Sequence, residues 1–476
     1  MLFNSLTFFL FFGVVSLGYY ALPHRYRWVL LLFSSCYFYL YFIPIYILIL
    51  FFTIGVDYVA GIYIETSAGT KRKKTFLILS LIANFGTLFF FKYYNFLNEN
   101  ITSIFRWTHH DNPLPYLNIL LPIGLSFHTF QAVSYTIEVY RGNAKAERHF
   151  GIYALYVMFY PQLVAGPIER PQHMLHQFRE KHIFSSKQVI GGLQLMLWGL
   201  FKKVAVGDLL SVYVNSIYDN YQMNTGFTLC VATWAFALMI YCDFSGYSDI
   251  AVGVAQVMGF ELMTNFRFPY FSKSITEFWR RWHISLSSWL RDYLYIPLGG
   301  SRSGKFLSYR NLMITMLLGG LWHGASWNFV IWGALNGMYL VVEKITGAGG
   351  SMTPAGSQPF FSRAAKAFFT FNLVCLAWIF FRSQTFSQAW YILCNIFHSS
   401  GFFTLRIQDT GLFCSMLLLV TFLLSIEYFF LRKAIFFNPV NGSIVSFKTI
   451  GFSSLLILLI ILFGNSEGGQ FIYFQF

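Results

Sequence analysis

Two histidines of this chain lie in surroundings that are unusual for an ionisable side chain. His323 stands in GGLWHGASW, residues 319–327, between two tryptophans and beside glycines. His283 stands in a block rich in tryptophan and arginine, WRRWHISLSSWLRDY. An ionisable group inside an apolar segment is costly, so such residues commonly mark a functional site. A neutral imidazole with a pKa near the operating pH can act as a general base. A packed histidine bonded to a neighbouring carbonyl is the structural alternative.

Charged residues near these histidines can bind an anionic substrate. Residues 275–300 repeat apolar side chains at helical spacing, which predicts an amphipathic helix at the membrane interface. Arg280, Arg281 and Arg291 lie largely off its apolar stripe, and guanidinium groups bind phosphates well. An interfacial anchor with an incidental histidine is the alternative for this helix. Asp243, in YCDFSGYSDIAVG, can orient a histidine, pair with an arginine or cap a broken helix.

Prolines interrupt the stretch FYPQLVAGPIERPQHM, residues 159–174. Pro161, Pro167 and Pro171 exclude a regular helix, so the backbone polar groups there need other partners. We therefore expect residues 150–186 to form a re-entrant or interfacial segment, which either lines a cavity or is purely structural.

Cysteine and histidine spacing predicts no metal site. None of the six cysteines forms a CxxC pair, and most lie in apolar runs, which is typical of small core residues. The sequence His109-His110-Asp111 has no further ligand placed near it, so we expect a solvated loop there.

The composition indicates an integral membrane protein. Of the 476 residues, 56% are hydrophobic and 11% are charged, whereas about 25% are charged in a typical soluble protein. The formal net charge is +14, and basic cytoplasmic loops account for most of such an excess. An acidic donor or carrier can share in it. No basic domain lies outside the apolar segments, so we expect no nucleic-acid partner.

Apolar runs of spanning length predict about 11 membrane crossings, together with re-entrant or interfacial helices. The candidate spans are 2–20, 28–43, 45–63, 75–97, 117–140, 187–206, 227–260, 309–345, 364–382, 411–431 and 447–464. A break at Pro44 puts the basic clusters at 24–27 and 71–74 on one side, which we expect to be cytoplasmic. The N-terminus and the polar loop 98–116 are then extracytoplasmic.

We expect a single integral-membrane domain over residues 1–476. Residues 1–149 supply N-terminal helices, 150–345 form a motif-bearing catalytic core, and 346–476 supply C-terminal helices. The Gly/Ser-rich stretch 347–358 is predicted to be a flexible loop.

Several motifs resemble, in their order, those of the membrane-bound O-acyltransferase superfamily. They are FYPQLVAGPIER, DFSGYSDIAVG, ITEFWRRWHISLSSWLRDYLYIPLGG and LLGGLWHGASW. The resemblance is strongest to the bacterial polysaccharide branch, the membrane subunit of alginate O-acetyltransferase, which LLPIGLSFHTFQAVSYTIEVYRG and the ending FIYFQF also resemble. It covers nearly the whole chain and is weakest at 347–360 and 385–445. The long tryptophan-arginine-histidine block is the most specific motif.

The resemblance implies an all-α polytopic fold, with a ring of helices around a thin central channel. It implies that His323 and His283 are the two functional, catalytic histidines, with His323 in the position usually taken as catalytic. We expect His323 to deprotonate the acceptor, and His283 to position the donor or stabilise the developing charge. An acyl-histidine intermediate is the alternative. We further expect six residues of these motifs to bind substrate: Arg280, Arg281, Arg291, Trp279, Trp322 and Asp243.

The resemblance also implies a reaction and its partners. An acetyl group passes from a cytoplasmic thioester, acetyl-CoA or an acyl carrier, toward an extracytoplasmic partner protein and a polysaccharide hydroxyl. No bound cofactor is expected, and the location is the bacterial inner membrane.

Three alternatives remain open at this point. D-alanyl transfer to teichoic acid shares the order of the motifs. A transporter would suit broken helices and buried polar residues, although no paired halves are visible. A scaffold for polysaccharide synthesis would not need His323.

Overall fold

The computed structural model describes all residues except 225, 303, 349–358, 398–404, 408, 434–446, 465–470 and 472–476. Within the described residues every regular element is a helix, which confirms the all-α prediction. The chain forms two compact units. Unit 1 comprises Met1–Gly192 and Ala251–Met263, and unit 2 comprises Leu193–Ile250 and Thr264–Phe476.

The helices follow one another along the chain in a fixed order. They are α1 (Leu6–Ala21), α2 (His24–Leu40), η1 (Pro44–Tyr46), α3 (Ile47–Thr66), α4 (Thr70–Leu88), η2 (Phe89–Tyr93), α5 (Tyr94–Trp107), α6 (Leu125–Arg141), α7 (Phe150–Met158), α8 (Tyr160–Leu163), α9 (Pro171–Met174), η3 (His176–Phe178), α10 (Ser186–Leu200), η4 (Phe201–Gly207), α11 (Asp208–Tyr218), η5 (Tyr221–Met223), α12 (Gly226–Val257), η6 (Pro269–Phe271), α13 (Ile275–Arg281), α14 (Ile284–Leu290), η7 (Arg291–Tyr295), α15 (Lys305–His323), α16 (Trp327–Thr346), α17 (Phe360–Arg382), α18 (Phe386–Asn395), α19 (Thr410–Lys433) and α20 (Phe447–Phe463).

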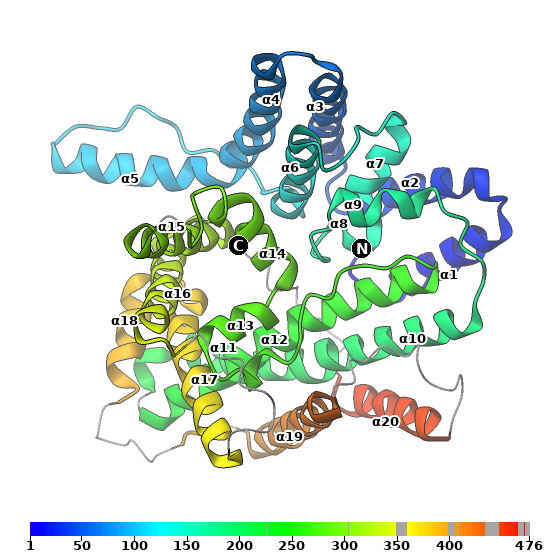
Figure 1. The fold of residues 1–476 in the computed structure, drawn as a ribbon. Coiled ribbons are helices and arrows are strands. Elements are labelled where there is room, and N and C mark those ends of the chain that lie inside the picture. The colour runs from blue at the N-terminus through cyan, green and yellow to red at the C-terminus, as the bar shows by residue number, and fades with distance from the viewer. Residues whose placement is uncertain are drawn as a thin grey trace. The chain divides into compact units, whose positions relative to one another are not determined.

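In unit 1, helices α3, α4 and α6 pack side by side (Figure 1). Asp57 of α3 accepts hydrogen bonds from Ser80 Oγ at 2.6 Å and from Asn84 Nδ2 at 2.9 Å, both on α4. Ser80 Oγ also donates to Thr136 Oγ1 of α6 at 3.1 Å. All four side chains are buried. Polar contacts of this kind associate helices in a membrane, because lipid gives apolar faces little reason to pair.

The predicted break near Pro44 is confirmed. Helix α2 ends at Leu40, and Pro44 opens the short turn η1 from which α3 starts at Ile47. Proline suits this place because its fixed φ fits the first turn of a helix, where its missing N–H is not needed.

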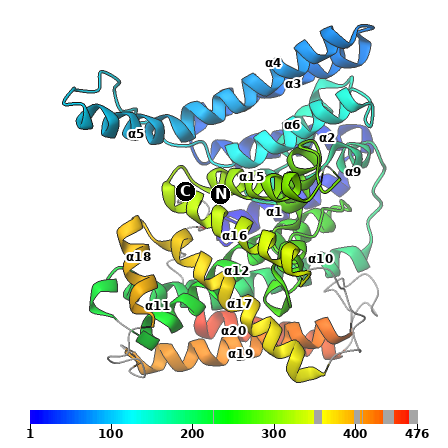
Figure 2. The same cartoon turned by 60° about the vertical axis from the view of Figure 1, so that its left-hand side comes forward.

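The predicted outer loop at 98–116 is wrong in its first half. Figure 2 shows α4 passing through the π-helical turn η2 into α5, which ends at Trp107. Asn98 Nδ2 donates to the Pro115 carbonyl at 3.1 Å, and Asn95 exchanges two hydrogen bonds with the backbone of Leu117. The polar side chains that favoured a loop in the sequence therefore belong to helix α5. They bond to the backbone of the segment that follows this helix.

Two predicted spans are wrong in extent. The span at 117–140 reduces to α6, which starts only after Gly124 has turned the chain with a φ of +76°. The span at 309–345 is two helices, α15 and α16, because Gly324 and Ser326 are extended.

In unit 2, α15 and α16 pack against each other at close range. A Cβ added to Gly320 would lie 2.2 Å from the Phe329 carbonyl oxygen, and one added to Gly333 would lie 2.4 Å from the Met316 carbonyl oxygen. Only glycine permits backbones to approach so closely.

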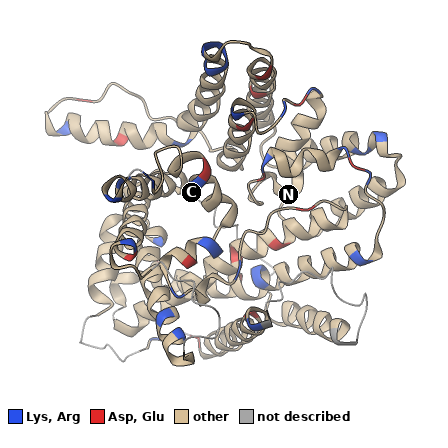
Figure 3. Ribbon diagram, in the orientation of Figure 1, with Lys and Arg blue, Asp and Glu red and all other residues tan. Residues whose placement is uncertain are grey.

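Six helices of the described residues are long and apolar enough to cross a membrane: Pro44–Thr66, Thr70–Trp107, Ser186–Tyr218, Gly226–Val257, Phe360–Arg382 and Thr410–Arg432. Figure 3 shows that most of the helical ribbon carries neither acidic nor basic residues. The protein is therefore a multi-pass membrane protein.

The region 150–186 is broken, as its prolines predicted. It contains α7, of nine residues, followed by α8 and α9, of four residues each. The predicted flexible loop at 347–358 lies outside the described residues from 349 onward. The six cysteines are free thiols. Cys242 and Cys375 are buried, as expected of core residues, whereas Cys394 and Cys414 are exposed, so the core prediction is wrong for these two.

Candidate active site

His323 is the last residue of α15 and not an interior residue of a long helix. The next residue, Gly324, leaves the helix with extended backbone, and a Cβ there would lie 2.0 Å from the Phe329 ring. The glycines of the motif therefore end α15 and allow α16 to pack closely against it. His323 is 4% exposed, and its ring centroid lies 5.0 Å from that of Trp332 and 5.4 Å from that of Phe381.

His283 lies at a break that the sequence did not indicate. The predicted amphipathic helix at 275–300 is wrong as a single element, because it divides into α13, α14 and the π-helical turn η7. His283 joins α13 to α14 with a φ of +42° and a ψ of +57°, a left-handed conformation that residues other than glycine seldom adopt. The break turns the ring into the interior, where it is fully buried.

Asn265 holds the ring of His283. Its Oδ1 lies 3.0 Å from His283 Nδ1, and its backbone carbonyl accepts a hydrogen bond from the Ile284 N–H at 2.9 Å. Asn265 is 2% exposed and precedes His283 by 18 residues. Burial lowers the pKa of His283 to about 3, so the imidazole is neutral at physiological pH.

Trp322 joins the two histidines. Its ring centroid is 6.2 Å from that of His283 and 5.0 Å from that of His323. Trp332, which contacts His323, also lies 5.8 Å from Trp279. The structure therefore brings four of the predicted site residues, two histidines and two tryptophans, into one aromatic cluster of unit 2.

Two of the three predicted site arginines form ion pairs with acidic neighbours. Arg281 Nη2 lies 2.5 Å from Glu277 Oε1, and Arg291 Nε lies 2.7 Å from Asp292 Oδ1. The pKa of Arg291 is raised, first of all by its hydrogen bond to Asp292. Arg280 is exposed at the end of α13.

Asp243 pairs with a lysine, which none of the three sequence interpretations anticipated. Its Oδ1 lies 2.5 Å from Lys203 Nζ, and Asp208 Oδ1 lies 2.7 Å from the same nitrogen. The adjacent Lys202 lies 2.5 Å from Asp249 Oδ2. The signal for this cluster was present: two consecutive lysines inside the predicted span 187–206 require anionic partners.

The sequence did not indicate Asn265 as a residue of the site either. It lies in a short connecting segment, MTNFRF, and an asparagine in such a segment usually indicates a turn. Its role depends on a partner far along the chain, so no local spacing could find it.

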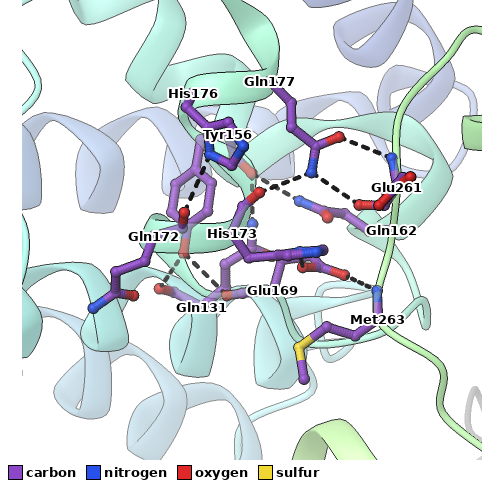
Figure 4. A network of polar contacts seen from close by, with 10 residues as sticks. All are labelled: Gln131, Tyr156, Gln162, Glu169, Gln172, His173, His176, Gln177, Glu261 and Met263. Atoms are coloured by element: carbon purple, nitrogen blue, oxygen red, sulfur yellow. Dashed lines mark hydrogen bonds and ion pairs between the residues drawn. The ribbon is translucent and has the colours of Figure 1, made fainter.

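A second histidine network lies in unit 1 (Figure 4). Glu169 is fully buried and accepts hydrogen bonds from His173 Nδ1 at 2.7 Å and from the Met263 N–H at 2.6 Å. Gln177 exchanges two hydrogen bonds with the backbone of Glu261. These contacts give the broken segment 159–178 the internal partners that its backbone and side chains require.

The fold and the histidine cluster together define a class: a polytopic helical membrane protein with two buried histidines in an aromatic site. The sequence profile of the membrane-bound O-acyltransferase family matches residues 149–386, which contain both histidines. The chain belongs to this family and is an O-acyltransferase.

The names of three relatives agree with this assignment. A probable alginate O-acetylase of Pseudomonas aeruginosa is 41% identical over 396 residues, 82% of this chain and 74% of the relative. A peptidoglycan O-acetyltransferase of Helicobacter pylori is 34% identical over 84% of this chain and 80% of the relative. A teichoic acid D-alanyltransferase of Streptococcus thermophilus is 29% identical over 56% of this chain and 70% of the relative.

Proposed function

We propose that the protein is an O-acetyltransferase that moves an acetyl group from a cytoplasmic thioester toward an extracytoplasmic polysaccharide. The observation that carries the proposal is the burial of His323 and His283 around Trp322, within the segment that matches the family. The names of the two most similar relatives reported above, an alginate O-acetylase and a peptidoglycan O-acetyltransferase, support acetyl as the group and a glycan as the acceptor.

In this proposal His323 is the general base. Its neutral imidazole takes the proton of the attacking hydroxyl while the hydroxyl oxygen bonds to the thioester carbonyl carbon. The carbon–sulfur bond then breaks, and the imidazolium returns the proton to the departing thiolate, so ester and thiol are the products. The aromatic rings around His323 favour the transient imidazolium, because ring faces attract cations.

The donor in this proposal is acetyl-CoA or an acetylated carrier, a substrate rather than a bound cofactor. Arg280, Arg281 and Arg291 bind its phosphates, and Trp279, Trp322 and Asp243 line the path to the histidines. An acyl-histidine on His323 is the alternative course of the same reaction.

The setting of the reaction belongs to the proposal as well. About 11 crossings form a ring around a thin channel, the N-terminus is extracytoplasmic, and the membrane is the bacterial inner membrane. An extracytoplasmic protein receives the acetyl group and passes it to the polysaccharide.

The test compares purified native protein with His323→Ala in lipid nanodiscs. Radiolabelled acetyl-CoA is supplied, and both thioester consumption and label transfer to an extracytoplasmic extract are followed. Loss of a general base lowers transfer by about 100- to 10,000-fold. The exposed His110 provides the matched control, because His110→Ala removes an imidazole far from any buried contact.

Equal turnover by native protein and a folded His323→Ala variant contradicts the assignment of the base. No turnover of acetyl-CoA by the native protein contradicts that donor, and an acetylated carrier is then supplied in its place.

A further inference from the structure

The amide of Asn265 can lie in only one orientation. Its Oδ1 accepts a hydrogen bond from the backbone N–H of Ser285 at 3.3 Å and one from Ser285 Oγ at 3.0 Å. A backbone N–H can only donate, so the amide oxygen and not the amide nitrogen must face it. On the other side, Asn265 Nδ2 donates to Ser248 Oγ at 3.2 Å.

This orientation decides which nitrogen of His283 carries the proton. The same Oδ1 lies 3.0 Å from His283 Nδ1, and an amide oxygen has no hydrogen to give. Nδ1 is therefore the donor. A neutral imidazole has one N–H, so Nε2 carries the lone pair.

The backbone fixes the ring in place. Ile284 N–H donates to the Asn265 carbonyl at 2.9 Å, and Arg267 N–H donates to the Arg281 carbonyl at 2.9 Å, so the segment 265–267 runs alongside the break at His283. The ring of Phe244 packs edge-on against the imidazole, with centroids 4.7 Å apart. A left-handed residue other than glycine is strained and persists where its surroundings determine it. Several contacts together therefore hold the His283 ring in one position.

The lone pair limits what His283 can bind. A nitrogen without hydrogen accepts from an N–H or O–H, but it cannot donate to a carbonyl oxygen or to a developing oxyanion. Of the two roles expected for His283, a neutral ring in this tautomer cannot stabilise charge through Nε2, so donor positioning remains.

We infer that Asn265 is a positioning residue that presents His283 Nε2 as a hydrogen-bond acceptor for an amide N–H of the acyl donor. The inference rests on the proposed thioester donor. Coenzyme A and acyl carriers share a pantetheine arm, in which the amide N–H nearest the sulfur is separated from it by two carbons. An acceptor that binds this N–H holds the thioester at a fixed distance from the ring and serves both kinds of donor.

The first experiment changes the donor and leaves the protein intact. Native protein in nanodiscs is given acetyl-CoA or an acetyl-CoA analogue in which an ester replaces the amide nearest the sulfur. The ester lacks the N–H and loses the proposed hydrogen bond to His283 Nε2, so we expect kcat/KM to fall by about 10- to 100-fold. Equal kcat/KM for the two donors overturns the proposed contact.

The second experiment changes the protein. Asn265→Leu removes the acceptor that holds Nδ1, and we expect it to reduce the preference for the amide donor to about twofold or less, mainly through KM. Ser248→Ala is the matched control, because Ser248 contacts Asn265 and not His283, and it should keep the preference. An unchanged preference in a folded Asn265→Leu variant overturns the positioning role.

Nitrogen-15 NMR of histidine-labelled protein tests the tautomer independently of turnover. The His283 signal is assigned by its loss in His283→Gln, and we expect a proton on Nδ1 and none on Nε2. The reverse tautomer overturns the inference even if acetyl transfer is found. If acetyl-CoA is not consumed, the proposed donor fails, while the NMR result still decides the state of His283.

Discussion

Two histidines of the protein, His173 in unit 1 and His283 in unit 2, each have Nδ1 bonded to a buried side-chain oxygen. For His173 the oxygen belongs to the carboxylate of Glu169, at 2.7 Å (Figure 4). For His283 it belongs to the amide of Asn265, at 3.0 Å. Both acceptors are almost completely inaccessible, with 0% and 2% of their surface exposed.

The two imidazoles nevertheless differ in the direction of their pKa shifts. The pKa of His173 is raised, first of all by its hydrogen bond to Glu169 and against a smaller effect of burial. The pKa of His283 is lowered to about 3 by burial. A carboxylate stabilises the protonated ring, whereas an amide orients the ring without supplying a charge. The comparison teaches that a histidine can be held in the same way for two purposes. In a supporting network a carboxylate favours its protonated form, and in a site an amide keeps it as a neutral acceptor.

The largest effect is expected where a buried cation is fully enclosed by carboxylates. Lys203→Met leaves Asp208 and Asp243 without their shared lysine, and removal of one partner of a buried ion pair costs about 3–5 kcal/mol in the free energy of unfolding. Reversible unfolding in detergent measures it, with the exposed Lys305→Met as control. A loss no larger than that of the control contradicts the view that buried charge in this protein depends on its counter-charge.

An intermediate effect is expected when His283 is given the environment of His173. Asn265→Asp keeps an acceptor at Nδ1 but adds a negative charge, which raises the pKa of His283. The ring becomes an imidazolium and loses its lone pair, so acetyl transfer falls by about 10-fold below the new pKa. Transfer recovers as the pH rises through that pKa. A pH–rate profile of native and variant proteins measures the shift, and coincident profiles contradict the comparison.

The smallest effect is expected when His173 is given the environment of His283. Native His173 has a raised pKa, so its stabilising contribution is fully present below the unfolded value of about 6.5 and is lost as the pH rises through the folded value. Glu169→Gln removes this contribution. Because the His173 side chain is 39% exposed, solvent screening limits the difference to about 1 kcal/mol or less.

Unfolding temperatures at pH 5.5 and pH 8.5 test this last prediction. Glu169→Gln should lose more stability relative to native protein at the lower pH. His176→Gln removes a histidine of an exposed ion pair with Glu180 and serves as the control. A deficit that is equal at both pH values shows that the carboxylate of Glu169 acts only through its hydrogen bonds.

Much of the site could be predicted because local patterns carry it. His323 and His283 stand out by residue type in apolar surroundings, and the prolines of 159–174 predicted the broken segment that the structure contains. Other features could not be predicted. The single helix expected at 275–300 is broken at His283 because Asn265, in a distant connecting segment, supplies hydrogen bonds to the break.

The sequence by itself determined that the protein is a helical membrane protein with two histidines suited to acyl transfer, because apolar run length and residue type are local properties. The tertiary structure alone decided that Trp322 joins these histidines, that Lys203 pairs with Asp243, and that Asn265 sets the tautomer of His283. Apart from the neighbours Trp322 and His323, these contacts join residues at least 18 positions apart in the chain. Their hydrogen bonds and charges act only over a few ångströms, and only folding brings them within that range.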